Sequence, residues 1–282
     1  MNTKSRLLAN AKINITLDVY NKRENGYHDI RSLVAFIDLY DEIFLTSANV
    51  FSVEFRGEFS DSISTTDNLL SITHEFMYSR YPNIKSYSAL VKKNIPVSSG
   101  LGGGTADAAA LLRYIMDDNK INYSEINNEE FTYKIGSDML VCIHNCSSFV
   151  SGVGDIVKKV SLDQNYHGVL INPNIIVSTK NIYEEYISEI TPNDHCYTES
   201  VTREYIMNGK NDLQPIVSKH YPIINSIIGS IEDTENCIVA RMSGSGPTCF
   251  GLYEDELTSK KALEALRKLY PSYWVKKFII ID

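Results

Sequence analysis

The sequence predicts an α+β protein built as two domains. Segments with the spacing of helices and segments with the alternation of strands are interspersed along the chain without a regular βαβ rhythm. A chain of 282 residues corresponds to one large domain or two of ordinary size. The Gly-Val-Gly sequence at 152–154 is expected to be a hinge, which gives domains at 1–153 and 154–282.

The first half begins with a strand. Residues 7–20 alternate apolar and polar side chains, which is the period of a half-buried strand. A turn follows at 21–27, with Asn25 and Gly26 at its tip. The other elements expected here are an apolar, β-rich segment at 33–45, a helix at 67–80, a strand at 87–97, a helix at 106–116 and an apolar patch at 139–143.

The second half repeats this mixture of helices and strands. The run Gly-Val-Leu-Ile within 167–172 predicts a strand, and residues 211–229 are mostly helical. A second glycine cluster, Met-Ser-Gly-Ser-Gly-Pro at 242–247, lies between apolar stretches. A helix at 256–269 and a strand at 274–281 close the chain.

The most informative stretch is Pro-Val-Ser-Ser-Gly-Leu-Gly-Gly-Gly-Thr-Ala at 96–106. Its four glycines permit tight turns and close approach of a ligand to the backbone. The Ala- and Leu-rich residues that follow favour a helix, and Thr105 is expected at its N-cap. Because the N-terminus of a helix attracts anions, the segment predicts a phosphate site and hence a nucleotide ligand.

Two better-known phosphate loops do not fit this segment, and a plain turn is the simpler alternative. No Gly-Lys-Ser/Thr follows, so it is not a Walker A loop. After Gly100 and Gly102, Thr105 stands where a dinucleotide fingerprint has its third glycine. A phosphate loop of a different type fits better.

Composition limits the choice of partner and compartment. The formal net charge is −8, which argues against nucleic-acid binding. The five cysteines are odd in number and form no CxxC pair, so we expect free thiols in a reducing cytoplasm. No signal peptide or membrane-spanning run is recognisable, and we expect a cytoplasmic protein that binds no membrane and is a monomer or a weak homodimer.

Three separated motifs together resemble those of the GHMP kinases. Ala-Lys-Ile-Asn stands at 11–14, the glycine-rich segment near residue 100, and Arg-Met-Ser-Gly-Ser-Gly-Pro at 241–247. Asn-Gly-Tyr-His at 25–28, Gly-Ser-Asp at 136–138 and Gly-Val-Gly-Asp at 152–155 are similar to one member of the family, whose substrate carries a cytidine diphosphate. The likeness spans nearly the whole chain.

This resemblance implies a two-domain GHMP kinase fold with the active site in the cleft between the domains, and an ATP-dependent transfer of phosphate to a small-molecule alcohol. Lys12 and Asp138 match the catalytic pair. The residues that match ATP-binding positions are Asn68, Lys93, Pro96, Val97, Ser98, Ser99, Gly100, Leu101, Gly102, Gly103, Gly104, Thr105 and Ala106. The residues that match substrate-binding positions are Asn14, Tyr27, His28, Thr179, Tyr183, Ser243 and Gly244.

The residue types suit these roles. Phosphoryl transfer depends on positioning and on stabilisation of charge. Asp138 can accept the proton of the substrate hydroxyl, and Lys12 can stabilise the developing negative charge. Mg²⁺ is expected to bridge the phosphates of ATP, and no residue is assigned as a metal ligand. Tyr27 and Tyr183 can stack on a pyrimidine whose edge His28 reads.

The chain departs from the family at two places. Thr105 and Ala106 replace two serines that usually follow the three glycines, so Ala106 loses a hydroxyl. Met139 and Leu140 replace the Val-Pro that usually follows the catalytic aspartate, which leaves the local backbone path open. Another GHMP kinase, of homoserine or mevalonate type, and a non-catalytic GHMP-like binding protein are the alternatives.

Overall fold

The computed structural model describes residues 5–123, 128–188 and 199–281, and the chain forms two compact units. Each unit is assembled from separate stretches of sequence. Unit 1 comprises Met1–Ala11, Leu39–Val97 and Gly102–Asn145. Unit 2 comprises Lys12–Asp38, Ser98–Leu101 and Cys146–Asp282. The continuous division after residue 153 stays a prediction.

Two long strands contribute to both units. Strands β1 (Ser5–Lys22) and β2 (His28–Ala48) pair with each other, and each has residues in unit 1 and in unit 2. The turn between them has Gly26 at a positive φ of 88°, as its Asn-Gly sequence predicts. The expectation of a strand at 7–20 is confirmed.

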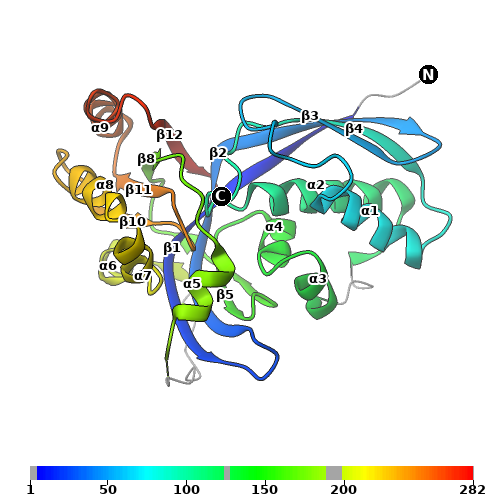
Figure 1. The fold of residues 1–282 in the computed structure, drawn as a ribbon, viewed down its shortest axis with the longest axis horizontal. Coiled ribbons are helices and arrows are strands. Elements are labelled where there is room, and N and C mark those ends of the chain that lie inside the picture. The colour runs from blue at the N-terminus through cyan, green and yellow to red at the C-terminus, as the bar shows by residue number, and fades with distance from the viewer. Residues whose placement is uncertain (1–4, 124–127, 189–198, 282) are drawn as a thin grey trace. The chain divides into compact units, whose positions relative to one another are not determined.

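In unit 1, the start of β1, the end of β2 and two further strands are combined with helices. The end of β2 pairs antiparallel with β4 (Ser86–Lys92), and β4 pairs parallel with β3 (Ser52–Arg56). The helices of this unit are α1 (Leu69–Arg80), α2 (Gly103–Asn119), α3 (Asn128–Lys134) and α4 (Met139–His144). Helices α1 and α4 pack on α2, and α1 and α2 lie on one side of β3 and β4 (Figure 1).

In unit 2, an antiparallel sheet has the order β10–β11–β8–β12, followed by the start of β2 and then β5 and β6. Its strands are β5 (Ser148–Gly152), β6 (Ile156–Lys159), β8 (His167–Asn172), β10 (Val239–Met242), β11 (Cys249–Tyr253) and β12 (Trp274–Ile281). The short strands β7 (Ser161–Leu162) and β9 (Ser200–Val201) form a separate parallel pair. The residues expected to form a hinge make the tight turn between β5 and β6, with Gly152 and Gly154 at positive φ.

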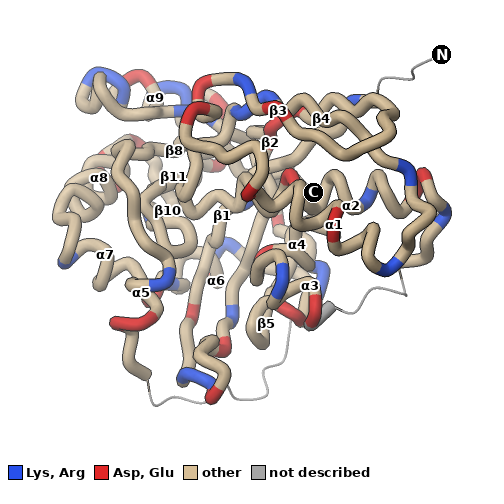
Figure 2. The backbone as a smooth tube through the Cα atoms, turned by 45° about the vertical axis from the view of Figure 1, so that its right-hand side comes forward, with Lys and Arg blue, Asp and Glu red and all other residues tan. Residues whose placement is uncertain are grey.

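The helices of unit 2 are α5 (Thr179–Glu185), α6 (Arg203–Asn208), α7 (Gln214–His220), α8 (Ile223–Glu232) and α9 (Glu256–Leu269), and the apolar faces of α8 and α9 pack on its sheet. Helix α8 packs on β10 and β11 through four buried isoleucines, Ile224, Ile227, Ile228 and Ile231. Figure 2 shows basic and acidic residues interspersed along α9, whose other face buries Ala262 and Leu266. In the described part of the chain, no helix combines the length and apolarity needed to cross a membrane.

Most predicted elements are confirmed, and several bounds differ. Helix α9 and strand β12 have the predicted ends. The strand expected at 87–97 ends at Lys92, because the N–H groups of Asn94 and Ile95 donate to the carboxylate of Asp41 instead of to a strand. The helix expected at 106–116 is longer, and its start is part of the candidate site.

Candidate active site

The glycine-rich segment presents the uncapped end of a long helix. Helix α2 begins at Gly103 after Gly102, whose φ of 70° is left-handed and which has no side chain to cap the helix. The first N–H groups of a helix have no intrahelical acceptor. The first turn of α2 therefore offers backbone donors and a positive dipole end to an anion.

The prediction that Thr105 caps this helix is wrong. The positive φ of Gly102 turns the chain into helical geometry three residues earlier, so Thr105 lies inside the first turn of α2. Its hydroxyl faces Gly136, since a Cβ placed on that glycine would lie 3.7 Å from Thr105 Oγ1. The loop at 136–138 is thereby brought beside the first turn of α2.

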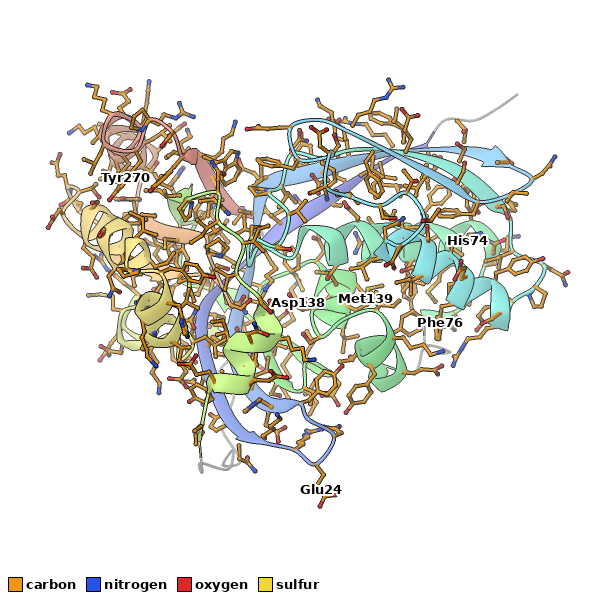
Figure 3. The ribbon with its side chains drawn as sticks, in the orientation of Figure 1. Glu24, His74, Phe76, Asp138, Met139 and Tyr270 are labelled. Carbon is orange, nitrogen blue, oxygen red and sulfur yellow. The ribbon has the colours of Figure 1, made fainter. Side chains whose placement is uncertain are left out.

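Asp138 comes at the end of this loop. It is the N-cap residue of α4, it is half-buried, and its carbonyl accepts the N–H of Cys142 at 3.0 Å. Its carboxylate makes no capping hydrogen bond with the helix. Met139, beside it in Figure 3, occupies the first helical position and is fully buried. Because that turn also tolerates proline, the exchange of Val-Pro for Met-Leu is compatible with the same helix start.

Lys12, on β1 in unit 2, is held by a buried polar network. Its Nζ donates to Asn14 Oδ1 at 2.6 Å, and Asn14 Nδ2 donates to Ser32 Oγ at 2.8 Å. Ser32 in turn donates to the carbonyl of Thr16 at 2.6 Å. With its oxygen and nitrogen both engaged, the amide of Asn14 has one orientation, and this fixes the ammonium of Lys12. Ser32 and Thr16 carry no sequence signal, since isolated hydroxyls in strands are common.

The second glycine cluster lies against the same network. Ser243 Oγ accepts the N–H of Asn14 at 3.1 Å and donates to the carbonyl of Gly100 at 2.9 Å. A Cβ on Gly244 would lie 3.0 Å from Asn14 Oδ1 and 3.6 Å from Lys12 Nζ. Lys12, Asn14, Gly100, Ser243 and Gly244 are therefore neighbours in unit 2.

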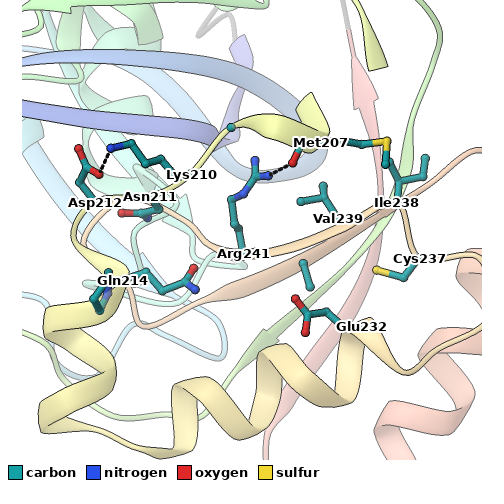
Figure 4. Close-up of a pocket in the computed structure, with 13 residues that line it drawn as sticks. Met207, Lys210, Asn211, Asp212, Gln214, Glu232, Cys237, Ile238, Val239 and Arg241 are labelled. Carbon is teal, nitrogen blue, oxygen red and sulfur yellow. Dashed lines mark hydrogen bonds and ion pairs between the residues drawn. The ribbon is translucent and has the colours of Figure 1, made fainter. Parts of the chain in front are cut away.

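Asn211 and Arg241 anchor this cluster, and neither was predicted as a site residue. Asn211 Nδ2 donates to the carbonyls of Met242 and Gly244, at 2.7 and 2.8 Å. Arg241 donates to the carbonyls of Ile15 and Ile206, and burial lowers its pKa to about 10. Both side chains line a pocket of about 500 Å³ (Figure 4). The signals in the sequence for these anchors were the Asn-Asp turn at 211–212 and, for Arg241, its place at the start of the motif at 241–247.

Among the residues predicted to recognise a base, His28 has a ring nitrogen without a hydrogen-bond partner. His28 is 6% exposed, and its Nδ1 lies 2.8 Å from the carbonyl of Tyr20, while its buried Nε2 has no hydrogen-bond partner. The ring of Tyr183 lies 5.8 Å from the His28 ring. Tyr27 is 39% exposed at the end of the β1–β2 turn. Thr179, at the start of α5, is hydrogen-bonded to Ser245 in the second glycine cluster at 2.7 Å.

Two predicted nucleotide contacts have structural partners in unit 1. Asn68 caps α1, since its Oδ1 accepts the N–H of Ser71 at 3.0 Å. Lys93 is 2% exposed, and its ammonium is paired with the carboxylates of Asp41 and Asp107. Their contacts with a nucleotide stay predictions. Within the described ranges, no group of three or more His, Cys, Asp or Glu side chains is arranged to hold a metal ion.

Comparison with known proteins identifies the family. The model of the GHMP kinases N terminal domain matches residues 68–150, and that of the GHMP kinases C terminal matches 202–272. A 4-diphosphocytidyl-2-C-methyl-D-erythritol kinase from Roseobacter denitrificans is 31% identical over 278 residues, which cover 96% of this chain and 91% of the relative. One from Parvibaculum lavamentivorans is 32% identical over 276 residues, which cover 95% of each chain. The chain belongs to the GHMP kinases.

A solved structure agrees with this assignment. The crystal structure of a 4-(cytidine 5'-diphospho)-2C-methyl-D-erythritol kinase has a TM-score of 0.77 to this chain at 24% identity, and the match covers 99% of this chain and 100% of the other. The predicted GHMP kinase fold is confirmed, and the protein is a small-molecule kinase.

Proposed function

We propose that this GHMP kinase uses ATP to phosphorylate the 2-hydroxyl of 4-diphosphocytidyl-2-C-methyl-D-erythritol, in the non-mevalonate route to isoprenoid precursors. The observation that carries this proposal is the full-length similarity to relatives named for that substrate, at 31% and 32% identity. The arrangement inside each unit supports the individual roles.

The phosphates of ATP are assigned to the segment 96–106. Support comes from the open first turn of α2 and from the left-handed conformations of Ser98, Gly100 and Gly102, which no bulky residue would adopt readily. Asn68 is proposed to line the nucleotide site while it caps α1. An Mg²⁺ ion is proposed to be held largely by the phosphate oxygens of ATP and by water.

The transfer step is assigned to Asp138 and Lys12. The substrate oxygen forms a bond to the γ-phosphorus, the bond from that phosphorus to the β–γ bridging oxygen breaks, and ADP leaves. Asp138 takes the hydroxyl proton as the new bond forms. Asp138 is a half-buried residue at the start of α4, and a carboxylate at this position can act as the proton acceptor. Lys12, oriented by Asn14, stabilises negative charge on the oxygens in transfer.

The cytosine is assigned to the surroundings of His28. The buried Nε2 is a hydrogen-bonding group whose pairing with a base would remove the cost of leaving it unsatisfied. The rings of Tyr27 and Tyr183 are proposed to stack on the base. Asn14, Thr179, Ser243 and Gly244 are proposed to contact the rest of the substrate.

We further propose a cytoplasmic enzyme, monomeric or weakly dimeric. Four of the five cysteines, Cys142, Cys146, Cys237 and Cys249, form no disulfide bond, as a reducing compartment favours. Cys196 lies outside the described residues.

The test is an ADP-release assay with a panel of alcohols. We expect turnover with the cytidine-containing substrate and none above background with homoserine, mevalonate or phosphomevalonate. Turnover with one of the other alcohols would replace the proposal by another GHMP kinase activity. ATP binding without turnover on any member of the panel would favour a binding protein.

A further inference from the structure

Three charged side chains are buried together in unit 1. Lys93, Asp41 and Asp107 are 2%, 0% and 1% exposed. The Lys93 ammonium lies 2.6 Å from Asp107 Oδ2 and is also bonded to Asp41 Oδ2. Nothing in the transfer step described above uses this cluster.

The cluster joins the two ends of the phosphate-binding segment. Asp41, on β2, accepts the N–H groups of Asn94 and Ile95 at 2.5 and 3.0 Å, directly before the segment begins. Asp107 lies on α2, directly after the segment ends. Lys93 bridges these two carboxylates, so the entry and the exit of residues 96–106 share one set of ionic contacts.

Ile95, which is held by Asp41, also packs against the first turn of α2. A Cβ placed on Gly103 would lie 2.9 Å from Ile95 Cγ2 and 3.6 Å from Asp41 Oδ2. Any shift of Ile95 or of the cluster therefore moves the backbone donors of this turn. Misplacement of positioned groups by about 1 Å is enough to cost orders of magnitude in rate.

We propose that Asp41, Lys93 and Asp107 are positioning residues that hold the phosphate-binding segment in its ATP-binding form. This inference rests on the proposed function, because it concerns the same nucleotide site. It assigns Lys93 a role through the backbone of the segment in place of the direct contact with ATP that the family resemblance implies.

The charge of the cluster should change with pH, which the charge of an apolar packing cluster would not do. Two carboxylates and one ammonium leave a net charge of −1 unless one carboxylate is protonated, and Asp107 Oδ1 has no hydrogen-bond partner. Burial raises the pKa of Asp107 to about 7, although the charge of Lys93 opposes this rise. Burial also opposes the charge of Lys93, but the two carboxylates outweigh it and raise the pKa of that ammonium.

The charged groups that act on Asp107 are Lys93, directly after β4, and Asp41, on β2. At low pH the cluster is neutral, and above the pKa of Asp107 it is negative beneath the turn that binds phosphate. We therefore expect ATP to bind more weakly as pH rises through neutrality, by roughly two- to fivefold for one charge near a helix end.

The first experiment measures the Kd of MgATP from pH 6 to 8, by calorimetry, for the wild type and for Asp107→Asn. The variant keeps the shape and an oxygen acceptor for Lys93 but does not titrate. We expect its Kd to vary less with pH than that of the wild type, since titration of the nucleotide itself is common to both. Equal pH dependence would overturn the proposal.

The second experiment compares Lys93→Met with Lys92→Met. Lys92 is the neighbouring lysine and has the same charge, but it is exposed and paired with Glu42 at the surface. We expect the Kd of MgATP to rise at least tenfold in Lys93→Met and to stay unchanged in Lys92→Met, at a temperature where melting curves show both variants folded.

Different outcomes would overturn the positioning role of the cluster and the proposed kinase function. A lower melting temperature with an unchanged Kd would make the cluster structural only and overturn its positioning role, while the kinase proposal would stand. If Lys93→Met does not fold, Asp107→Asn decides alone. A wild type that binds no ATP would overturn the proposed function and this inference together.

Discussion

Replacement of Gly100 and of Gly104 by alanine is expected to change stability in opposite directions. Both glycines belong to the same Gly-rich segment, so local composition does not distinguish them. Gly100 has a φ of 77°, and an added Cβ would overlap the backbone carbonyl oxygen of Ser243 and approach Gly246 O at 3.1 Å. Gly104 is helical, and its Cβ would meet only Leu69 Cδ1, at an ordinary 3.6 Å.

The magnitudes follow from these two environments. For Gly100→Ala, the left-handed backbone costs about 1–2 kcal/mol and forced displacement of packed backbone about 1–3 kcal/mol more. The free energy of unfolding should therefore fall by about 2–5 kcal/mol. For Gly104→Ala, relief of the entropy of a helical glycine should raise it by about 0.5–1 kcal/mol.

Urea denaturation of both variants beside the wild type measures the two changes, with the slope of the transition as a control for altered denatured states. Gly100→Ala within about 0.5 kcal/mol of the wild type, the usual range for a neutral surface change, would refute the close approach of Gly100 to Ser243. A loss of stability in Gly104→Ala would refute the ordinary, unstrained contact expected between the added Cβ and Leu69.

Three further outcomes are expected. Asp138→Asn should lower kcat by about a hundredfold or more, the scale of a positioned base, with an unchanged melting temperature; near-normal turnover would exclude that role. His28→Ala should raise the KM for the cytidine substrate about tenfold to a hundredfold, the scale of one lost hydrogen bond, and leave the KM for ATP unchanged; equal changes in both would indicate a structural role. Because folding raises the pKa of Asp107 to about 7, the folded state binds a proton that the unfolded state releases. The free energy of unfolding should therefore fall as pH rises from about 4 to 7. Chemical denaturation across this range should show a smaller fall in Asp107→Asn, and identical curves would contradict the assignment.

Local patterns predicted the regular elements well. Helix α9 and strand β12 were predicted with their observed ends, because an amphipathic period and alternating apolar residues act over neighbouring positions. The start of α2 was predicted wrongly because the local pattern favoured a cap at Thr105. A threonine before an alanine-rich run is the usual cap. The helix starts three residues earlier because of the backbone conformation of Gly102.

Contacts between residues far apart in the chain could not be predicted from local sequence patterns. Asp41, Lys93 and Asp107 are separated by 52 and 14 residues, and charged side chains are ordinarily solvated, so nothing local indicates their burial together. Asn14 and Ser243 were predicted as site residues from motif resemblance, but their direct contact is a backbone-to-side-chain hydrogen bond between residues 229 positions apart. The roles of both in substrate binding remain predictions.

The interleaving of the two units has a consequence for synthesis on the ribosome. Phe36 and Ile37, on β2, are translated early, yet their strand partners Ile281 and Ile280 come at the end of the described chain. Unit 1 can be completed when residue 145 has emerged, whereas unit 2 waits for β12. A stretch of β2 therefore lacks this partner through most of translation, when unpaired strand backbone is a template for association with other chains. Cutting the gene after residue 153 would give two fragments, neither of which contains a whole unit 2.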